Sequence, residues 1–420
     1  MPEIAGARLY ADLDPYAYEL LLTDAERAVL RRLRDALERD VAPHVDDWWE
    51  RAECPQALRD TLAGLRLMDP VDGAEPSSLF AGFRTFELAR TDVSTAVLFG
   101  GHGWLFRNAV LHGGSPEQAA RWDPAVRDWS TWGAFALTEP DHGSDVARGL
   151  ETAAVRDGDT WALTGAKRWI GAAGLADLLC VFARDRSESA ADGRVLAFLV
   201  DRRAPGVTVE TIGRKIAVRI VPNGHVTLDG VRVPEAMRLQ RVESFGDVNR
   251  LLRAMRTDVA WLAAGAQAGA YRAALAYATR REQFGRPIAS FQLVQAKLAA
   301  MLGNLTASLG MAVRLSQLAD AGTADTSPQT PSVEPVETRS LAVDPGFSDA
   351  DAALAKGWIA RRTRETVALA REVCGGNGIT LDAGVARFFA DAEAIYTFEG
   401  TDEINHLVVG RAITGFGAFV

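Results

Sequence analysis

Residues 160–171 read Thr-Trp-Ala-Leu-Thr-Gly-Ala-Lys-Arg-Trp-Ile-Gly and belong to a part of the chain whose pattern differs from that on either side. From about residue 133 to Pro234, short runs rich in valine, leucine, threonine and aromatic residues are separated by turn signals such as Asp157-Gly158 and Asp229-Gly230. Because no helical pattern lies between these strands, they predict an antiparallel barrel or sandwich.

The flanking segments have the period of helices. Thr23 followed by Glu26 forms a capping box, and the apolar residues that follow at helical spacing end before Pro43. Beyond Pro234, alanine-rich stretches of similar length with short connections predict an antiparallel four-helix bundle; they cover 249–280, 290–320 and 350–373.

The fold class is therefore α+β, in the order helical, strand-rich, helical. We expect an N-terminal α-helical domain at 1–132, a middle β-barrel domain at 133–245 and a C-terminal helical bundle at 246–420. One segment fits none of these domains. Residues 323–346 are rich in proline, serine, threonine and glutamate and have little that could form a core, which predicts a disordered surface insertion.

Composition argues against several classes of protein. The formal net charge of −9 argues against a general nucleic-acid or membrane-surface binder. The cysteines at 54, 180 and 374 imply no disulfide framework, and the histidines show no metal-ligand spacing. The N-terminus has no signal-peptide pattern and no apolar stretch approaches the roughly 20 residues that cross a bilayer, so we expect a cytoplasmic protein without metal.

Four segments carry the candidate chemistry, although each has an ordinary structural explanation by itself. They contain neither a dinucleotide-binding GxGxxG after a strand nor a P-loop. The segments are Phe135-Ala-Leu-Thr-Glu-Pro-Asp-His-Gly-Ser-Asp145, Gly165-Ala-Lys-Arg-Trp-Ile-Gly171, Arg281-Glu-Gln-Phe-Gly285 with Phe291-Gln-Leu, and Cys374-Gly-Gly-Asn-Gly378 with Tyr396-Thr-Phe-Glu-Gly-Thr401.

Taken together, in this order and spacing, the four segments resemble the acyl-CoA dehydrogenase family over almost the whole chain. The resemblance is greatest to the branch of glutaryl-CoA dehydrogenases and plant-type short-chain acyl-CoA oxidases. It implies an FAD enzyme in which the flavin lies between the β-domain and the helical bundle. It also implies a homotetramer, since FAD is shared between neighbouring subunits.

The resemblance assigns cofactor and substrate contacts residue by residue. Flavin contacts fall on Phe135, Leu137, Thr138, Ser144, Trp169 and Gly171. Contacts to the rest of FAD, partly from a neighbouring subunit, fall on Arg281, Gln283, Phe284, Gln292, Gly375, Gly376, Thr401 and Glu403. Contacts to the acyl-CoA substrate fall on Ser144, Arg256 and Gly400.

Glu399 matches the catalytic base of the family. The α-proton of a thioester is only weakly acidic, so the carbonyl must accept hydrogen bonds as enolate character develops. The family supplies these from the backbone N–H of the base and from a ribityl hydroxyl of FAD. Burial should raise the pKa of Glu399 towards working pH. The β-hydrogen then leaves as hydride to flavin N5, giving the trans-2-enoyl-CoA, and an electron-transfer flavoprotein accepts the electrons.

Two residues depart from the family pattern. Many dehydrogenases of the family carry threonine or serine near flavin N5 at the position of Gly171. The oxidase-like relatives have glycine there, as this chain does. Either a backbone N–H serves there instead, or the flavin reacts differently with oxygen. Ala96 stands where glutaryl-CoA enzymes use an arginine for the distal carboxylate. Burying a carboxylate without that charge is costly, so we expect short or medium uncharged acyl chains.

Other readings remain open on the sequence alone. An acyl-CoA oxidase would pass electrons directly to O₂ and form hydrogen peroxide. A flavin-bearing DNA-binding or regulatory relative would have lost the reaction, which the acidic charge and Glu399 oppose. If Glu399 is not the base, the next candidate is Asp258, the only carboxylate in 249–261.

Overall fold

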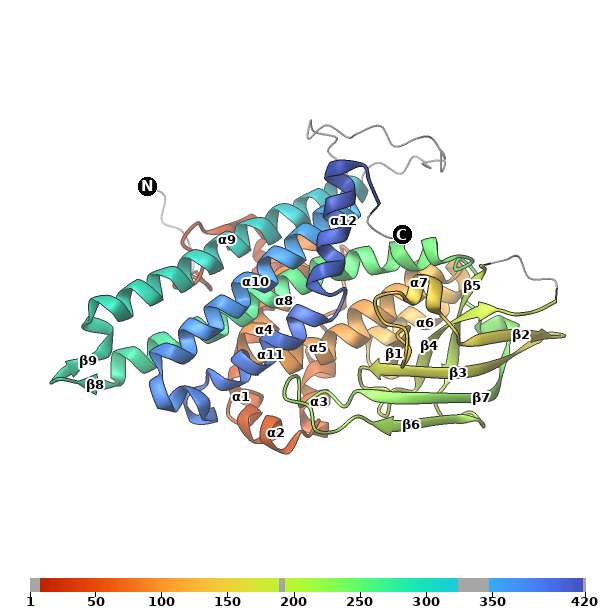
Figure 1. Ribbon diagram of the computed structural model, residues 1–420, viewed down its shortest axis with the longest axis horizontal. Helices are drawn as coiled ribbons and strands as arrows, with labels where there is room; N and C mark the ends of the chain where they lie inside the picture. Colours follow the sequence, from red (N-terminus) through yellow and green to blue (C-terminus); the bar gives the residue numbers. More distant parts are fainter. Residues whose placement is uncertain (1–7, 189–192, 324–346, 418–420) are drawn as a thin grey trace. The chain divides into compact units, whose positions relative to one another are not determined.

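The computed structural model describes residues 8–188, 193–323 and 347–417, in the order helical, strand-rich, helical that the sequence predicts (Figure 1). The helices ahead of the first strand are η1 (Tyr18–Leu21), α1 (Asp24–Asp40), α2 (Val45–Arg51), α3 (Gln56–Gly64), α4 (Ser78–Thr91), α5 (Val93–Gly100), η2 (Gly101–Phe106), η3 (Ala109–Gly113) and α6 (Pro116–Arg127). Both halves of the predicted capping box between Thr23 and Glu26 are present at the start of α1.

The chain folds into two compact units. The helical unit contains residues up to Asp46, Pro70–Val93 and the chain from Arg256 onward. The sheet unit contains Asp47–Asp69 and Ser94–Met255. The domain boundaries at 132/133 and 245/246 stay a prediction. The insertion predicted at 323–346 lies, apart from its first residue, outside the described residues.

The sheet unit is built on one seven-stranded sheet. Its strands are β1 (Gly133–Ala136), β2 (Ala153–Asp157), β3 (Thr160–Ile170), β4 (Leu178–Asp185), β5 (Val195–Asp201), β6 (Val207–Thr211) and β7 (Gly224–Pro234). The order is β1-β4-β2-β3-β7-β6, with β5 paired to β4. Most pairs are antiparallel, while β4 runs parallel to both β1 and β2. The short helices α7 (Val146–Gly149) and η4 (Glu235–Met237) complete the region.

Strand β3 is irregular where the sequence segment 165–171 lies. Its register against β7 shifts between Leu163 and Gly165, and again between Lys167 and Ile170. A register shift bends a strand and redirects its side chains. The segment with the predicted flavin contact Trp169 therefore leaves the regular ladder.

The C-terminal region is helical, as the alanine-rich stretches predict. Its elements are α8 (Phe245–Arg280), β8 (Glu282–Gln283), β9 (Arg286–Pro287), η5 (Ile288–Ser290), α9 (Gln292–Thr323), α10 (Asp349–Val373), η6 (Gly375–Ile379), η7 (Leu381–Ala383), α11 (Ala386–Thr397) and α12 (Asp402–Thr414). Figure 1 shows α8, α9 and α10 running alongside one another. Gln267 of α8 joins them, since its amide donates to Ser308 Oγ of α9 (2.9 Å) and to Thr363 Oγ1 of α10 (3.1 Å).

Helix α4 packs tightly against α8 in the helical unit. A Cβ atom on Gly82 would lie 2.1 Å from the ring of Trp261, and one on Gly265 would lie 2.6 Å from the Phe86 carbonyl oxygen. Glycine is required at both positions because any side chain would push the two helices apart. Trp261 is fully buried and donates to Ser316 Oγ at 2.9 Å. The helix that carries Arg256 and Asp258 is thus fixed in place.

One expectation from the sequence was wrong. By length and composition, residues Gln292–Ala321 of α9 could cross a membrane, although we expected no stretch of that kind. A single such helix is weak evidence, because a helix inside a bundle passes the same test.

Glu87 of α4 forms a buried ion pair with two arginines of the helical unit. Its carboxylate accepts from Arg34 at 2.9 and 3.0 Å and also from Arg90. Burial alone would raise the pKa of Glu87, but the Arg34 hydrogen bonds and the Arg90 charge lower it to about 2. The free energy of unfolding gained from this carboxylate is therefore complete above pH 4.5, the ordinary value, and is lost as the pH falls towards 2.

We expect Glu87→Gln to lower the free energy of unfolding by about 3–5 kcal/mol at pH 7, because two buried guanidinium groups lose their counter-charge. The variant should also lose part of the pH dependence of stability below pH 4.5. Denaturant unfolding at several pH values measures both effects. Lys297→Met, which breaks an exposed pair with Glu372, is the control and should change stability by about 0–1 kcal/mol. An equal effect of the two substitutions would contradict this account.

Candidate active site

Glu399 lies in the short connection between α11 and α12 of the helical unit. Phe398 ends α11 in an extended conformation, and Glu399 then adopts a left-handed backbone with φ of 54°. Gly400 follows with φ of 89°, and Thr401 caps α12 by accepting from the Ile404 N–H at 3.3 Å. A left-handed conformation at a residue other than glycine costs about 1–3 kcal/mol and is concentrated at functional sites. Glu399 shares this conformation with other residues, among them Trp169 and Phe284, which are also predicted to contact the cofactor.

Charged side chains from two long helices surround the Glu399 carboxylate. Burial raises the pKa of Glu399, and the positive charges of Arg256 on α8 and Lys356 on α10 oppose that rise. A general base works best when its pKa lies near the operating pH. At Glu399 desolvation favours proton uptake, and the charges of Arg256 and Lys356 oppose it.

A second carboxylate, Asp258, lies on the same helix as Arg256. Burial raises the pKa of Asp258 to about 7, with the Arg84 charge opposing the rise and the Glu399 charge adding to it. Asp258 thus remains the second candidate for a base.

Arg256, the predicted CoA contact, is half-buried on α8. Its Nη1 atom lies 4.0 Å from the Asp349 carboxylate, at the start of α10. This distance is at the limit of an ion pair, so Asp349 holds the guanidinium only loosely. The arginine retains donors for an anionic ligand.

In the sheet unit, the predicted flavin contacts at 135–138 lie at the end of strand β1 and directly after it. The Phe135 ring packs on Phe182, with ring centroids 4.7 Å apart, and Leu137 belongs to the buried core of this unit. The Thr138 carbonyl accepts from the Arg168 N–H at 2.8 Å, which ties this segment to β3.

A buried ion pair that the sequence did not reveal fixes the same segment. Lys167 is fully buried, and its amino group donates to the Leu137 carbonyl (3.1 Å) and to Glu139 Oε1 (2.8 Å). The Glu139 carboxylate also accepts from the N–H groups of Glu151 (2.6 Å) and Thr152 (2.9 Å). Burial lowers the pKa of Lys167 to about 8 against the opposing charge of Glu139. Lys167 thus binds the residues on both sides of Thr138 and holds this segment in position.

Trp169 and Gly171 of the sheet unit both have open surroundings. Trp169 has a positive φ of 65° and 52% of its surface is exposed, while its carbonyl accepts from Asn223 Nδ2 at 3.2 Å. A Cβ atom on Gly171 would meet only Val221, at 3.9 Å. A large aromatic ring held out by the backbone is suited to stacking on a planar group such as a flavin.

The remaining cofactor residues of the helical unit are exposed. Phe284, at the turn of the β8–β9 hairpin, is 93% exposed and touches Phe291 edge-on at 5.9 Å between ring centroids. Arg281, Gln283 and Gln292 are also exposed. Side chains that reach into a neighbouring subunit would be exposed in this way in a single chain.

Gly375 and Gly376 begin η6 with an open approach to their backbone. A Cβ atom on either glycine would have no neighbour within 4 Å, and Gly375 has φ of 58°. Exposed backbone N–H groups in such a turn are suited to a diphosphate. Together with the exposed ring of Trp169 and the free donors of Arg281, this open backbone fits the chemistry of FAD.

Each unit therefore brings one group of predicted residues together. The helical unit gathers Glu399, Gly400 and Arg256, and the sheet unit gathers Phe135, Leu137, Thr138, Trp169 and Gly171. Ser144 and Glu403 are exposed side chains of the sheet and helical units. Among the described residues, no group of three or more His, Cys, Asp or Glu side chains is placed to hold a metal ion.

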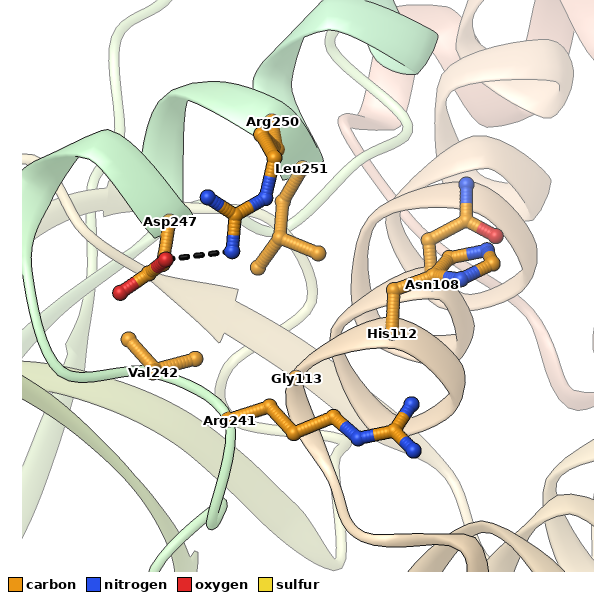
Figure 2. A pocket seen from close by; sticks show the side chains of 8 residues that line it. All are labelled: Asn108, His112, Gly113, Arg241, Val242, Asp247, Arg250 and Leu251. Atoms are coloured by element: carbon orange, nitrogen blue, oxygen red, sulfur yellow. Dashed lines mark hydrogen bonds and ion pairs between the residues drawn. The ribbon is translucent and has the colours of Figure 1, made fainter. Parts of the chain in front are cut away.

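The sheet unit also has a cavity of about 680 Å³ that none of the predicted site residues lines (Figure 2). Figure 2 shows Asn108 and His112 on one side, and Asp247 paired with Arg250 on the other. Burial and the charges of Arg107 and Arg241 lower the pKa of His112. The remaining lining residues are Gly113, Arg241, Val242 and Leu251.

Comparison with known proteins shows which family the chain resembles in sequence and fold. The family models for the N-terminal, middle and C-terminal domains of acyl-CoA dehydrogenases match residues 23–128, 134–231 and 245–414. The chain is 30% identical to a cyclohex-1-ene-1-carbonyl-CoA dehydrogenase of Geobacter metallireducens, over 93% of this chain and 98% of the relative.

Solved structures show the same likeness. A glutaryl-CoA dehydrogenase of Mycobacterium smegmatis is 34% identical, with a TM-score of 0.84 over 96% of this chain and 98% of the other. A second glutaryl-CoA dehydrogenase of that organism, solved in complex with FADH2, is 29% identical, with a TM-score of 0.86 over 98% of this chain and 100% of the other.

The fold and the site therefore define an FAD-dependent oxidoreductase that acts on CoA thioesters. The chain belongs to the acyl-CoA dehydrogenase family, and its activity is the dehydrogenation of an acyl-CoA.

Lys167→Met should lower both thermal stability and FAD content, because Glu139 is left as an uncompensated buried charge beside Thr138. Breaking such a pair costs about 3–5 kcal/mol. Thermal unfolding and the ratio of FAD to protein measure the two effects, with Lys297→Met as control. The double variant Lys167→Met, Glu139→Leu should recover part of the stability. A Lys167→Met protein with normal FAD content would contradict a role for this pair in shaping the flavin contacts.

Proposed function

We propose that this enzyme desaturates a short- or medium-chain, uncharged acyl-CoA to the trans-2-enoyl-CoA, with Glu399 as the base that removes the α-proton. The observation that carries the proposal is the position of Glu399. Its carboxylate is desolvated, has a raised pKa and is flanked by two cations, on a backbone held in a strained conformation.

The chain's own groups account for the proton transfer. The ionised Glu399 carboxylate takes the α-proton, while the N–H of the same residue donates a hydrogen bond to the thioester carbonyl. That hydrogen bond stabilises the negative charge that develops on the carbonyl oxygen. We assign Arg256 to binding of the CoA portion, and Gly400 and Ser144 to contacts with the thioester. FAD, when bound, accepts the β-hydrogen as hydride at N5.

The cofactor assignments from the sequence enter the proposal together. On the flavin side these are Phe135, Leu137, Thr138, Ser144, Trp169 and Gly171. The residues assigned to the other parts of FAD are Arg281, Gln283, Phe284, Gln292, Gly375, Gly376, Thr401 and Glu403. The exposure of Phe284 and Arg281 supports a contact with FAD of a second subunit, and we therefore propose a homotetramer.

For the electron acceptor we propose an electron-transfer flavoprotein. An oxidase that uses O₂ is the second candidate, and Gly171 is the observation in its favour, since the space beside it is open.

We expect Glu399→Gln to keep the fold, the FAD content and substrate binding while flavin reduction falls by roughly 10²–10⁴-fold, the contribution of a positioned base. Glutamine is nearly isosteric but cannot take a proton at neutral pH. Anaerobic stopped-flow reduction by butyryl-CoA measures the rate. A variant that reduces at more than about a tenth of the wild-type rate would exclude Glu399 as the base, and Asp258→Asn would then be tested in the same way.

The acyl preference follows from the surroundings of Ala96 in the sheet unit. Ala96 is fully buried on α5, and the nearby rings of Phe99 and Trp104 pack edge to face with centroids 6.1 Å apart. These side chains offer no charge to a distal carboxylate.

Butyryl- or hexanoyl-CoA should accordingly reduce the flavin faster than glutaryl-CoA in an anaerobic panel. Ala96→Arg should improve glutaryl-CoA relative to butyryl-CoA if the register of this position is correct. Faster reduction by glutaryl-CoA in the wild type would overturn the assignment of Ala96. The buried Arg84 of α4 would then be the next residue to replace.

Reoxidation in air should be slow and should accelerate when an electron-transfer flavoprotein is added. Peroxide production and substrate consumption, followed side by side, measure this. Peroxide formed as fast as substrate is consumed, with no benefit from the flavoprotein, would make the enzyme an oxidase. Gly171→Thr would then show whether the open space at this position is responsible.

A further inference from the structure

Lysine is rare in this chain and occurs only at 167, 215, 297 and 356, while arginine carries the rest of the positive charge. Lys297 forms the exposed pair with Glu372. The other three direct their amino groups at backbone carbonyls. A compact ammonium with three donors suits such a confined position better than a planar guanidinium.

Lys356 holds the loop that carries Glu399. It lies on α10 with only 1% of its surface exposed, and its amino group donates to the Tyr396 carbonyl (3.1 Å) and the Gly400 carbonyl (2.6 Å). One carbonyl precedes Glu399 by three residues and the other follows it by one. The two hydrogen bonds therefore span the left-handed turn and fix both its ends to the same atom.

A neutral side chain supports the same turn from α12. Asn405 Nδ2 donates to the carbonyls of Gly400 (2.8 Å) and Thr401 (2.9 Å), and Asn405 is buried. Helix α10 passes close by, since a Cβ atom on Gly357 would lie 3.6 Å from Asn405 Cβ. The turn is thus held by one charged and one uncharged donor.

We propose that Lys356 is the positioning residue of this enzyme's base: it holds the 396–400 turn so that the Glu399 carboxylate and N–H are aimed together. This rests on Glu399 being the base. Nothing in the proposal requires Lys356 to touch the substrate or to exchange a proton.

The electrostatic part of the role has a definite sign. Lys356 lowers the pKa of Glu399, against the rise caused by burial. Burial lowers the pKa of Lys356 itself to about 8, against the opposing charges of Glu399 and Asp402, so the amino group is charged at neutral pH. The other charged groups that face this cluster are Arg84 of α4, Arg256 and Asp258 of α8, Arg361 of α10, and Glu403 and His406 of α12.

The test compares Lys356→Met, Lys356→Arg and Asn405→Ala by anaerobic flavin reduction over pH 5–9, with FAD content and thermal unfolding alongside. Lys356→Met should slow reduction about 10–100-fold at saturating substrate, because misplacement by about 1 Å has effects of this size. Its acid limb should also move up by about one pH unit, since a neighbouring cation is lost. The substrate dissociation constant should change much less than the rate constant.

The other variants separate charge from geometry. Lys356→Arg should keep the acid limb of the wild type and recover part of the rate. Asn405→Ala should slow reduction without moving the acid limb, because only a neutral hydrogen bond is lost. Lys297→Met removes a lysine elsewhere and should match the wild type.

A wild-type rate and pH profile in Lys356→Met would overturn the proposal, as would an unshifted acid limb. If that variant fails to fold, Lys356→Gln, which keeps a donor without the charge, must show the shifted limb. Glu399→Gln is measured in the same series. Loss of reduction in Glu399→Gln with a normal Lys356→Met defeats the positioning role alone, whereas normal reduction in Glu399→Gln defeats the proposed function itself.

Discussion

A base that removes a weakly acidic proton must be taken out of water and yet stay ionised, and the base that we propose, Glu399 of the helical unit, is subject to this constraint. Burial favours the protonated carboxyl, and the cations on α8 and α10 oppose this effect. The left-handed turn fixes where the carboxylate lies, at a cost of about 1–3 kcal/mol that the surrounding hydrogen bonds must offset. Close packing of α4 on α8 through Gly82 and Gly265 holds one of these cations in place.

The sheet unit also contains a buried lysine that supports predicted site residues, here on a strand and not on a helix. A buried lysine, Lys167, again donates to a carbonyl beside predicted site residues, and Glu139 balances its charge. In both units the residues expected to face ligand are fixed by a charged group behind them. Removing either lysine tests whether this support, rather than direct contact with ligand, determines the geometry.

The helices and most strands could be predicted because their signals are local: the capping box at Thr23, the alanine-rich periods and the Asp-Gly turns. Glu399 was assigned as the base because a short motif carries it, and this role stays a prediction. The sequence did not predict the short strands β1 and β2 or the parallel pairing of β4. The strands that pair with them are distant in sequence. Lys356 and Lys167 were missed for the same reason: a lysine in a helix or strand predicts an exposed side chain unless its distant carbonyl partners are known. Its rarity in an arginine-rich chain was the available signal.

The proposed removal of the α-proton by Glu399 is tested most directly where hydride transfer cannot occur. A thioester such as 3,3-dimethylbutanoyl-CoA has α-hydrogens but none on the β-carbon, so exchange of its α-hydrogens with deuterium from solvent reports proton abstraction alone. With the FAD-loaded enzyme, we expect NMR to show enzyme-dependent exchange in the wild type and almost none in Glu399→Gln. Equal exchange rates in the two proteins would show that another group takes the proton.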